Sequence, residues 1–234
     1  MKLIIKEDYE GMTDAALEVF LEYFPESTVL GFATGNTPVL LYERLSALCR
    51  AGKISFRDKI SFNLDEYCGL GPKDRHSYRY YMDSRLFGSI DIQAKNIHFP
   101  DGTLPEKDSV AMYSRELGLL GPIDLQILGI GKNGHIAFNE PGSGIDSVTR
   151  VTELQSETVE RNKAPVQRAI TMGMKEILSA RTILLMASGK DKSEALLRTV
   201  RGTPSPSTPA SFLQSHKNTY IFADKDAARN LQDT

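Results

Sequence analysis

The sequence predicts an α/β fold in which one doubly wound, mostly parallel sheet carries helices on both faces. Short apolar runs alternate along the chain with segments whose apolar residues recur at helical spacing. Strands separated by helices imply right-handed crossovers between parallel neighbours. The 234 residues contain no repeat and no low-complexity linker, so we expect a single domain over residues 1–234.

Six short apolar segments are typical of buried strands. In chain order they are Lys2–Lys6, Thr28–Ala33, Lys59–Asn63, Ile123–Leu128, Arg181–Ala187 and Tyr220–Phe222. Six other segments have apolar residues at the spacing of a helix. These predicted helices are Met12–Tyr23, Pro38–Ala51, Ser77–Phe87, Ser109–Leu120, Lys190–Arg201 and Lys225–Leu231. The alternation predicts a Rossmann-like order of elements.

Two segments lie outside this pattern. Residues 203–209 are rich in Pro and Ser but too few for a linker, so we expect an ordered loop. Polar residues dominate 147–172, where we expect a lid.

Composition excludes several classes of function. The formal net charge is −2, and acidic and basic residues are interspersed without a basic stripe, which argues against a nucleic-acid partner. No stretch approaches the roughly 18 apolar residues of a membrane span. The apolar run at the N-terminus is too short for a signal peptide. Cys49 and Cys68 have no metal-ligand spacing and fit a reduced, cytoplasmic protein.

The most informative segment is Leu128-Gly-Ile-Gly-Lys-Asn-Gly-His-Ile-Ala-Phe-Asn-Glu-Pro141. It leaves a predicted strand, turns on glycines and carries His135 and Glu140, at the strand end where open α/β sheets bind ligands. An imidazole exchanges protons near neutral pH, and a nearby carboxylate can orient it. The alternative is that a His and a Glu stand near glycines by chance.

Two strand-to-helix turns are candidate anion sites. In Gly31–Pro38, Thr37 is a predicted N-cap and Pro38 a first helical residue, and backbone N–H groups at such a helix start favour phosphate. In Ala187–Lys192, two lysines stand in a first helical turn, where the dipole disfavours cations unless an anion is bound; Lys192 would be its counter-charge. The alternatives are a capped helix without a ligand and a pair of solvated lysines.

A third strand end carries two adjacent acids, Asp65 and Glu66. In an extended segment their side chains point to opposite faces, so one of them is expected to face a site. A carboxyl group beside an apolar strand end can have a raised pKa and act as a base. All these segments lie at the carboxyl ends of predicted strands, which indicates proton transfer on a phosphorylated small molecule.

The chain resembles glucosamine-6-phosphate deaminases over about residues 30 to 215. The resemblance rests on Ala33-Thr-Gly-Asn-Thr-Pro38, Asn63-Leu-Asp-Glu-Tyr67, Gly129-Ile-Gly-Lys-Asn-Gly-His-Ile-Ala-Phe-Asn-Glu-Pro141, Ser188-Gly-Lys-Asp-Lys192 and Pro209-Ala-Ser-Phe-Leu-Gln214, in the family's order. It implies conversion of glucosamine 6-phosphate and water to fructose 6-phosphate and ammonia, without a metal or an organic cofactor.

The resemblance also implies roles for individual residues. Asp65 would be the base that takes the C2 proton, and His135 would move the proton in ring opening, assisted by Glu140 and Asn133. The implied phosphate ligands are Thr34, Gly35, Asn36, Thr37 and Lys192.

Two departures from longer family members bear on these roles. Some of them carry Asp at the position of Asn133; an amide can bond a ring nitrogen but brings no charge, so His135 should depend more on Glu140. The allosteric hexamers of the family extend further at the C-terminus, so we expect a monomer or small homo-oligomer without allosteric activation. Arg150, Arg161 and Lys163 lie where a lid could help to hold the phosphate.

Two rival functions remain open. A sugar-phosphate lactonase of the same fold would activate water and would not remove a C2 proton. A non-catalytic sugar-phosphate sensor would not need Asp65, His135 and Glu140 together.

Overall fold

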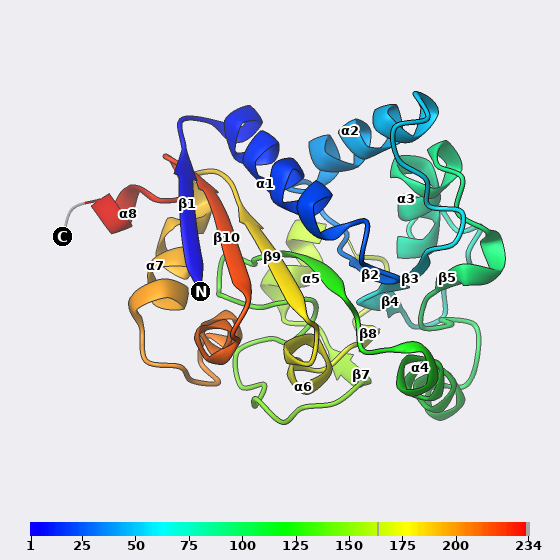
Figure 1. Ribbon diagram of the computed structural model, residues 1–234. Coiled ribbons are helices and arrows are strands. Elements are labelled where there is room, and N and C mark those ends of the chain that lie inside the picture. Colours follow the sequence, from blue (N-terminus) through cyan, green and yellow to red (C-terminus); the bar gives the residue numbers. More distant parts are fainter. Residues whose placement is uncertain (163, 233–234) are drawn as a thin grey trace.

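The computed structural model describes residues 1–162 and 164–232, which form a central seven-stranded sheet flanked by helices (Figure 1). All its neighbouring strands are parallel, in the order β1-β10-β9-β6-β2-β3-β5. The strands are β1 (Lys2–Lys6), β2 (Val29–Phe32), β3 (Ile60–Asn63), β5 (Ile97–His98), β6 (Leu125–Gly129), β9 (Thr182–Ala187) and β10 (Thr219–Asp224). The predicted α/β fold class is confirmed, with β5 as a strand that the sequence analysis missed.

Helices cover both faces of this sheet. Figure 1 shows α1 and α2 along one side and α4, α6 and α7 along the other. The α-helices are α1 (Tyr9–Tyr23), α2 (Val39–Arg50), α3 (Tyr78–Arg85), α4 (Glu106–Leu120), α5 (Ser156–Asn162), α6 (Met174–Leu178), α7 (Ser193–Arg201) and α8 (Arg229–Gln232). Short 3-10 turns occupy η1 (Phe87–Ser89), η2 (Ala94–Asn96), η3 (Lys190–Lys192) and η4 (Pro209–Ser215).

The core is divided by the sheet into two apolar layers. One layer joins α1, α2 and α3 to the sheet through side chains such as Phe20, Leu45 and Met82. The other joins α4, α6 and α7 to the opposite face through Tyr113, Ile177 and other buried residues. Because both faces are covered, the central strands β9 and β10 are buried along their whole length, which explains their nearly continuous apolar sequence.

A second, antiparallel sheet was not predicted. It has the order β4-β8-β7 and contains β4 (Asp65–Tyr67), β8 (Arg168–Thr171) and β7 (Arg150–Glu153). Residues 147–172, expected to form a lid, therefore contain β7, α5 and all of β8. Whether they move stays a prediction, but they are built into regular structure.

The start of α2 differs from the prediction. Thr37 does not cap the helix, because α2 begins at Val39 with Pro38 in the cap position and no side-chain cap. The hydroxyl of Tyr9 accepts from the N–H of Leu40 and donates to the carbonyl of Thr37. A tyrosine distant in sequence thus replaces the expected local cap, which moves the helix start.

Two further helix boundaries were also wrong. The predicted helix over Lys225–Leu231 is shortened to α8, because the Asp224 carboxylate accepts from the N–H of Ala227 and holds a turn there. The predicted helix over Lys190–Arg201 is divided into η3 and α7, so both lysines precede the α-helix.

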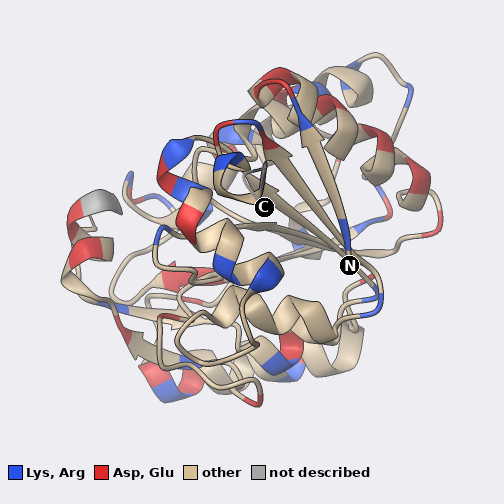
Figure 2. Ribbon diagram, turned by 90° about the vertical axis from the view of Figure 1, so that its left-hand side faces the viewer, with Lys and Arg blue, Asp and Glu red and all other residues tan. Residues whose placement is uncertain are grey.

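Figure 2 shows acidic and basic residues interleaved over the helices of the side that faces the viewer. No helix within the described part of the chain is long and apolar enough to cross a lipid bilayer.

Candidate active site

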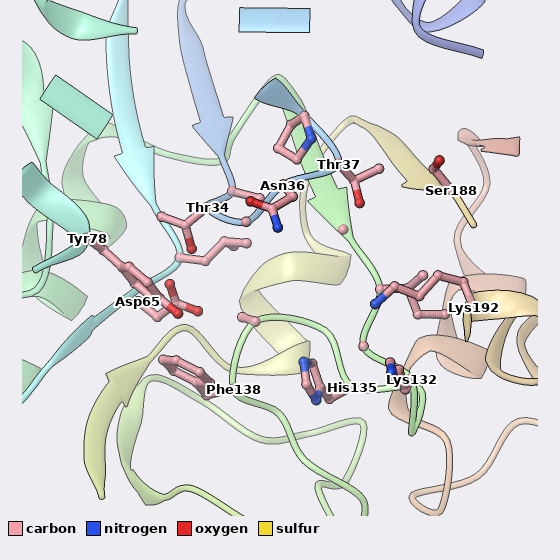
Figure 3. A pocket seen from close by; sticks show the side chains of 18 of the residues that line it. Thr34, Asn36, Thr37, Asp65, Tyr78, Lys132, His135, Phe138, Ser188 and Lys192 are labelled. Atoms are coloured by element: carbon pink, nitrogen blue, oxygen red, sulfur yellow. The ribbon is translucent and has the colours of Figure 1, made fainter. Parts of the chain in front are cut away.

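The carboxyl ends of four adjacent central strands, β3, β2, β6 and β9, open into one pocket of about 640 Å³ (Figure 3). The pocket brings together most of the residues that the sequence analysis selected. Its predicted members are Thr34, Gly35, Asn36, Thr37, Asp65, His135 and Lys192. Asn133 and Glu140 do not line the pocket and contact His135 from behind.

The loop after β2, residues 33–38, forms one wall. Gly35 has a φ of 97°, a left-handed conformation that other residues rarely adopt. The hydroxyl of Tyr81, on α3, donates to the carbonyl of Gly35 at 2.7 Å. The hydroxyl of Tyr9, on α1, donates to the carbonyl of Thr37 at 2.9 Å. Two helices therefore hold this loop from outside through its carbonyl oxygens.

Lysines form the wall of the pocket that lies opposite Asp65. Figure 3 shows Lys192 and Lys132 on the side of the pocket away from Asp65. Lys192 stands at the N-cap position of α7, where backbone N–H groups add to its charge. Nζ of Lys132 lies 3.4 Å from Oδ2 of Asp191, which links the loop after β6 to the loop after β9. The pocket is thus cationic at the end opposite the carboxylate.

Asp65 lies just past the carboxyl end of β3, with 5% of its surface exposed. β3 ends at Asn63, and after Leu64 the main chain enters β4, where Asp65 pairs with Thr171. Burial raises the pKa of Asp65 well above its ordinary value, and the neighbouring charge of Glu66 raises it further. A buried carboxyl with a raised pKa is a stronger base than an exposed one once it is ionised.

Glu66 points away from the pocket, as the alternation along an extended segment requires. Its Oε1 accepts from the N–H groups of Tyr67 and Tyr78, and its Oε2 from the N–H of Arg79. It therefore caps the start of α3 and joins that helix to β4. Burial raises the pKa of Glu66 to about 7 against the opposing effect of these N–H bonds.

His135 and Glu140 form a pair at the floor of the pocket. Nδ1 of His135 lies 3.3 Å from Oε2 of Glu140, and both residues are buried. Burial by itself would raise the pKa of Glu140, but its contacts with His135, Thr158 and Asn133 hold that pKa below the ordinary value. Glu140 is thus a stable anion that can orient the ring and neutralise a charge on it.

Asn133 supports the His135–Glu140 pair, but through other atoms than the expected ring nitrogen of His135. Its Oδ1 accepts from the main-chain N–H of His135 at 3.1 Å, and its Nδ2 donates to Oε2 of Glu140 at 2.7 Å. The amide therefore orients the backbone of one partner and the carboxylate of the other. Glu140 is the charged group beside the ring, and a greater dependence of His135 on it stays a prediction.

Glycine is required where the loop after β6 approaches the imidazole. A Cβ on Gly131 would lie 2.4 Å from the ring of His135, closer than any real contact. Ala137, which lines the pocket, has a φ of 53°, an uncommon conformation for a residue with a side chain. The loop geometry is therefore specific to the position of His135.

Among the basic residues expected near a lid, Arg150 does not line the pocket. Arg150 is half-buried and donates to Oδ1 of Asn139 and to Oγ of Ser143, both at 2.9 Å. It therefore holds the loop that follows Glu140. The side chain of Arg161 and the whole of Lys163 lie outside the described residues.

Several pocket residues were missed by the sequence analysis. They include Lys132, Tyr78, Tyr81 and Phe138. Lys132 lies inside the glycine-rich motif between Gly131 and Asn133, so its position was a usable signal. No signal identified the tyrosines, because α3 is brought to the pocket by tertiary contacts, among them the cap made by Glu66 and the bond of Tyr81 to Gly35.

Metal-holding groups are not found in the described part of the chain: no three His, Cys, Asp or Glu side chains lie together suitably. Cys68 is half-buried, and burial raises the pKa of its thiol to about 11, so it is a poor nucleophile.

The family model described as glucosamine-6-phosphate isomerases/6-phosphogluconolactonase matches residues 16–222. The chain belongs to this family. A glucosamine-6-phosphate deaminase of Thermoanaerobacter sp. (strain X514) is 41% identical over 100% of this chain and 96% of its own. The enzyme of the same name from Oceanobacillus iheyensis is 42% identical over 99% and 96%.

Solved structures agree with this membership. A monomeric glucosamine-6-phosphate deaminase has a TM-score of 0.94 at 36% identity, covering 98% of this chain and 99% of its own. A 6-phosphogluconolactonase from Thermotoga maritima has a TM-score of 0.79 at 24% identity over 96% and 99%, which shows a shared fold only. Among family members, this chain is an enzyme of the deaminase type in sequence and in structure.

Proposed function

We propose that this enzyme converts glucosamine 6-phosphate and water to fructose 6-phosphate and ammonia. The observation that carries the proposal is the placement of a buried carboxyl, Asp65, and a His135–Glu140 pair around one pocket with lysines at its far end. The reaction needs an anion site, a base near C2 and a group that moves a proton on the ring. The pocket offers one candidate for each.

The phosphate would bind between the 33–38 loop and Lys192. Side chains of Thr34, Asn36 and Thr37 are available to donate, and Gly35 lets the backbone turn close to an anion. Anchoring at one end directs the sugar carbons along the pocket toward Asp65 and His135. The fixed phosphate thereby places C1 and C2 before any proton moves.

Ring opening would use His135. The neutral imidazole takes a proton from the C1 hydroxyl and returns one to the ring oxygen. Glu140 stabilises the charge that appears on the ring in between. Asn133 holds both partners in position.

Isomerisation would use Asp65. Its carboxylate removes the proton from C2 of the open chain and delivers a proton to C1. The C1 oxygen gains a proton and the C2 amine loses one, so the C1 aldehyde becomes a hydroxymethyl group and C2 becomes an imine. Water then adds at C2, and ammonia leaves. A C2–H is a weak acid, so its base must be close and desolvated, and the raised pKa of Asp65 meets that need.

The test is a coupled assay of chelator-treated protein with glucosamine 6-phosphate in D2O. We expect ammonia and fructose 6-phosphate in equal amounts, and deuterium exchange at C2 of recovered substrate. Hydrolysis of 6-phosphogluconolactone without ammonia release would instead establish the lactonase. Tight binding of sugar phosphates without turnover would establish the sensor.

We also propose that the protein acts in the cytoplasm as a monomer or small homo-oligomer, without a metal, an organic cofactor, or a nucleic-acid or membrane partner. Support comes from the structural neighbour described as monomeric and from the free cysteines Cys49 and Cys68. Light scattering on a size-exclusion column checks the mass, and a hexamer would contradict the proposal.

A further inference from the structure

The first turn of α5 and the residue before it contact two members of the His135 relay. Thr158 is buried, and its hydroxyl donates to Oε1 of Glu140 at 2.5 Å. Just before the helix, Oε1 of Gln155 accepts from Nδ2 of Asn133 at 3.3 Å. A segment distant from the catalytic loop in sequence thus reaches the two residues that support His135.

These contacts bear on the orientation of one carboxylate. Oε2 of Glu140 faces Nδ1 of His135 and also accepts from Asn133, whereas Oε1 is held by Thr158. The last torsion of a glutamate side chain is soft, so a carboxylate held at one oxygen can still rotate. Bonds at both oxygens hold the plane that presents Oε2 to the ring.

The attachment of α5 does not depend on this hydrogen bond. Leu154 and Val159 pack with Tyr67 and Phe138 in a small apolar cluster of their own. Removing the Thr158 hydroxyl therefore leaves the apolar contacts of the segment intact. The hydrogen bond and the packing can be tested separately.

The charges around Glu140 are simple. Within the part of the chain that the structure describes, the ionisable group facing it is His135, on its own loop. The groups that face it from Asn133 and from α5 are neutral. Removing the hydroxyl of Thr158 should therefore change the pKa of Glu140 directly.

We propose that Thr158 is a positioning residue, whose hydroxyl aligns Glu140 with His135 when the first turn of α5 rests against the catalytic loop. The inference rests on the deaminase function proposed above. It adds one side chain of α5, Thr158, to the groups that support the proton relay.

The test compares Thr158→Val, which keeps the shape and removes the hydroxyl, with Thr158→Ser, which keeps the hydroxyl. We expect the Val variant to lose about tenfold in kcat with KM unchanged, the cost of one hydrogen bond to a charged group. Without that donor the pKa of Glu140 rises, so the acid limb of kcat should move up by roughly one pH unit. The Ser variant should restore both.

The matched control is Thr152→Val, the same substitution on β7 at a hydroxyl that donates to the main-chain carbonyl of Glu153. It should behave as the unsubstituted enzyme. Unchanged kcat and pH profile in Thr158→Val would overturn the proposal, as would a Ser variant or a Thr152 control as impaired as the Val variant.

A measurement without turnover separates this inference from the proposed function. The carboxyl 13C resonance of Glu140, assigned by its loss in Glu140→Gln, is titrated with labelled protein. Its midpoint should rise in Thr158→Val and stay in Thr158→Ser, and equal midpoints overturn the positioning role. If the unsubstituted protein released no ammonia, the deaminase function would fail while this titration still decided the role of Thr158.

Discussion

Asp65 and Glu66 are adjacent carboxyl groups with different surroundings. Asp65 faces the pocket and is raised in pKa by burial and by its neighbour, whereas Glu66 faces α3 and receives three backbone N–H bonds. The two-residue period of an extended chain predicted that they diverge. Only the fold shows which of them reaches the pocket.

Replacing Asp65 tests the base. Asp65→Asn keeps the size of the side chain but cannot accept the C2 proton, so kcat should fall by about 10²–10⁴-fold. Circular dichroism and the melting temperature should show an intact fold. Near-normal turnover in this variant would remove Asp65 from the mechanism.

Lys192 is expected to bind the phosphate. Lys192→Met keeps the apolar stem and removes the charge, and kcat/KM should fall by roughly 10–100-fold, the cost of a lost bond to a charged group. In steady-state kinetics, most of this loss should appear as a higher KM. A loss confined to kcat would instead place this lysine near the reacting atoms.

The glycine-rich loop after β6 acts as one structural unit. Its turns bring the ring of His135 against Gly131 and, at the same time, beside Glu140. Gly131→Ala puts a methyl group where the imidazole lies, so the ring must leave its place. We expect at least a tenfold fall in kcat.

A glycine that does not contact His135 provides the control for the Gly131 substitution. Gly118→Ala lies on α4, where an added Cβ meets open space, and should keep full activity. A Gly131→Ala enzyme as active as this control would show that the loop tolerates a displaced ring.

Secondary structure was predictable where its cause is local. Apolar runs identified six of the seven central strands, and β5 was missed because Ile97 and His98 are two residues with no apolar run. The small sheet was missed because its strands pair across long separations, as Asp65 does with Thr171. The cap of α2 was wrong because the hydroxyl of Tyr9 replaced it.

At the scale of the whole molecule, the buried carboxyl groups link stability to pH. The pKa of Glu66 is about 7 in the fold, whereas a free glutamate titrates near 4.5. Between these values the folded state keeps a proton that the unfolded state has lost. The contribution of Glu66 to the free energy of unfolding is therefore fully present below pH 4.5 and is lost as the pH rises toward 7.

Glu66→Gln tests that linkage. The amide does not titrate, so the fall in the free energy of unfolding between pH 4.5 and 7 should shrink by about 3 kcal/mol relative to the unsubstituted protein. Denaturant titrations at the two pH values give the difference. An identical fall in both proteins would mean that Glu66 is ionised throughout this range.

The amino-acid sequence by itself determined six of the seven central strands, the alternation of strands with helices, and the strand ends that carry Asp65, His135 and Lys192. Those features follow from local periodicity and from the rule that parallel strands share a carboxyl edge. Tertiary structure alone decided the partners: Glu66 on α3, Asn133 on the backbone of His135, and Thr158 on Glu140. The contacts of Glu66 and Thr158 join separate elements, and that of Asn133 depends on how the glycine-rich loop folds, so no local pattern encodes them.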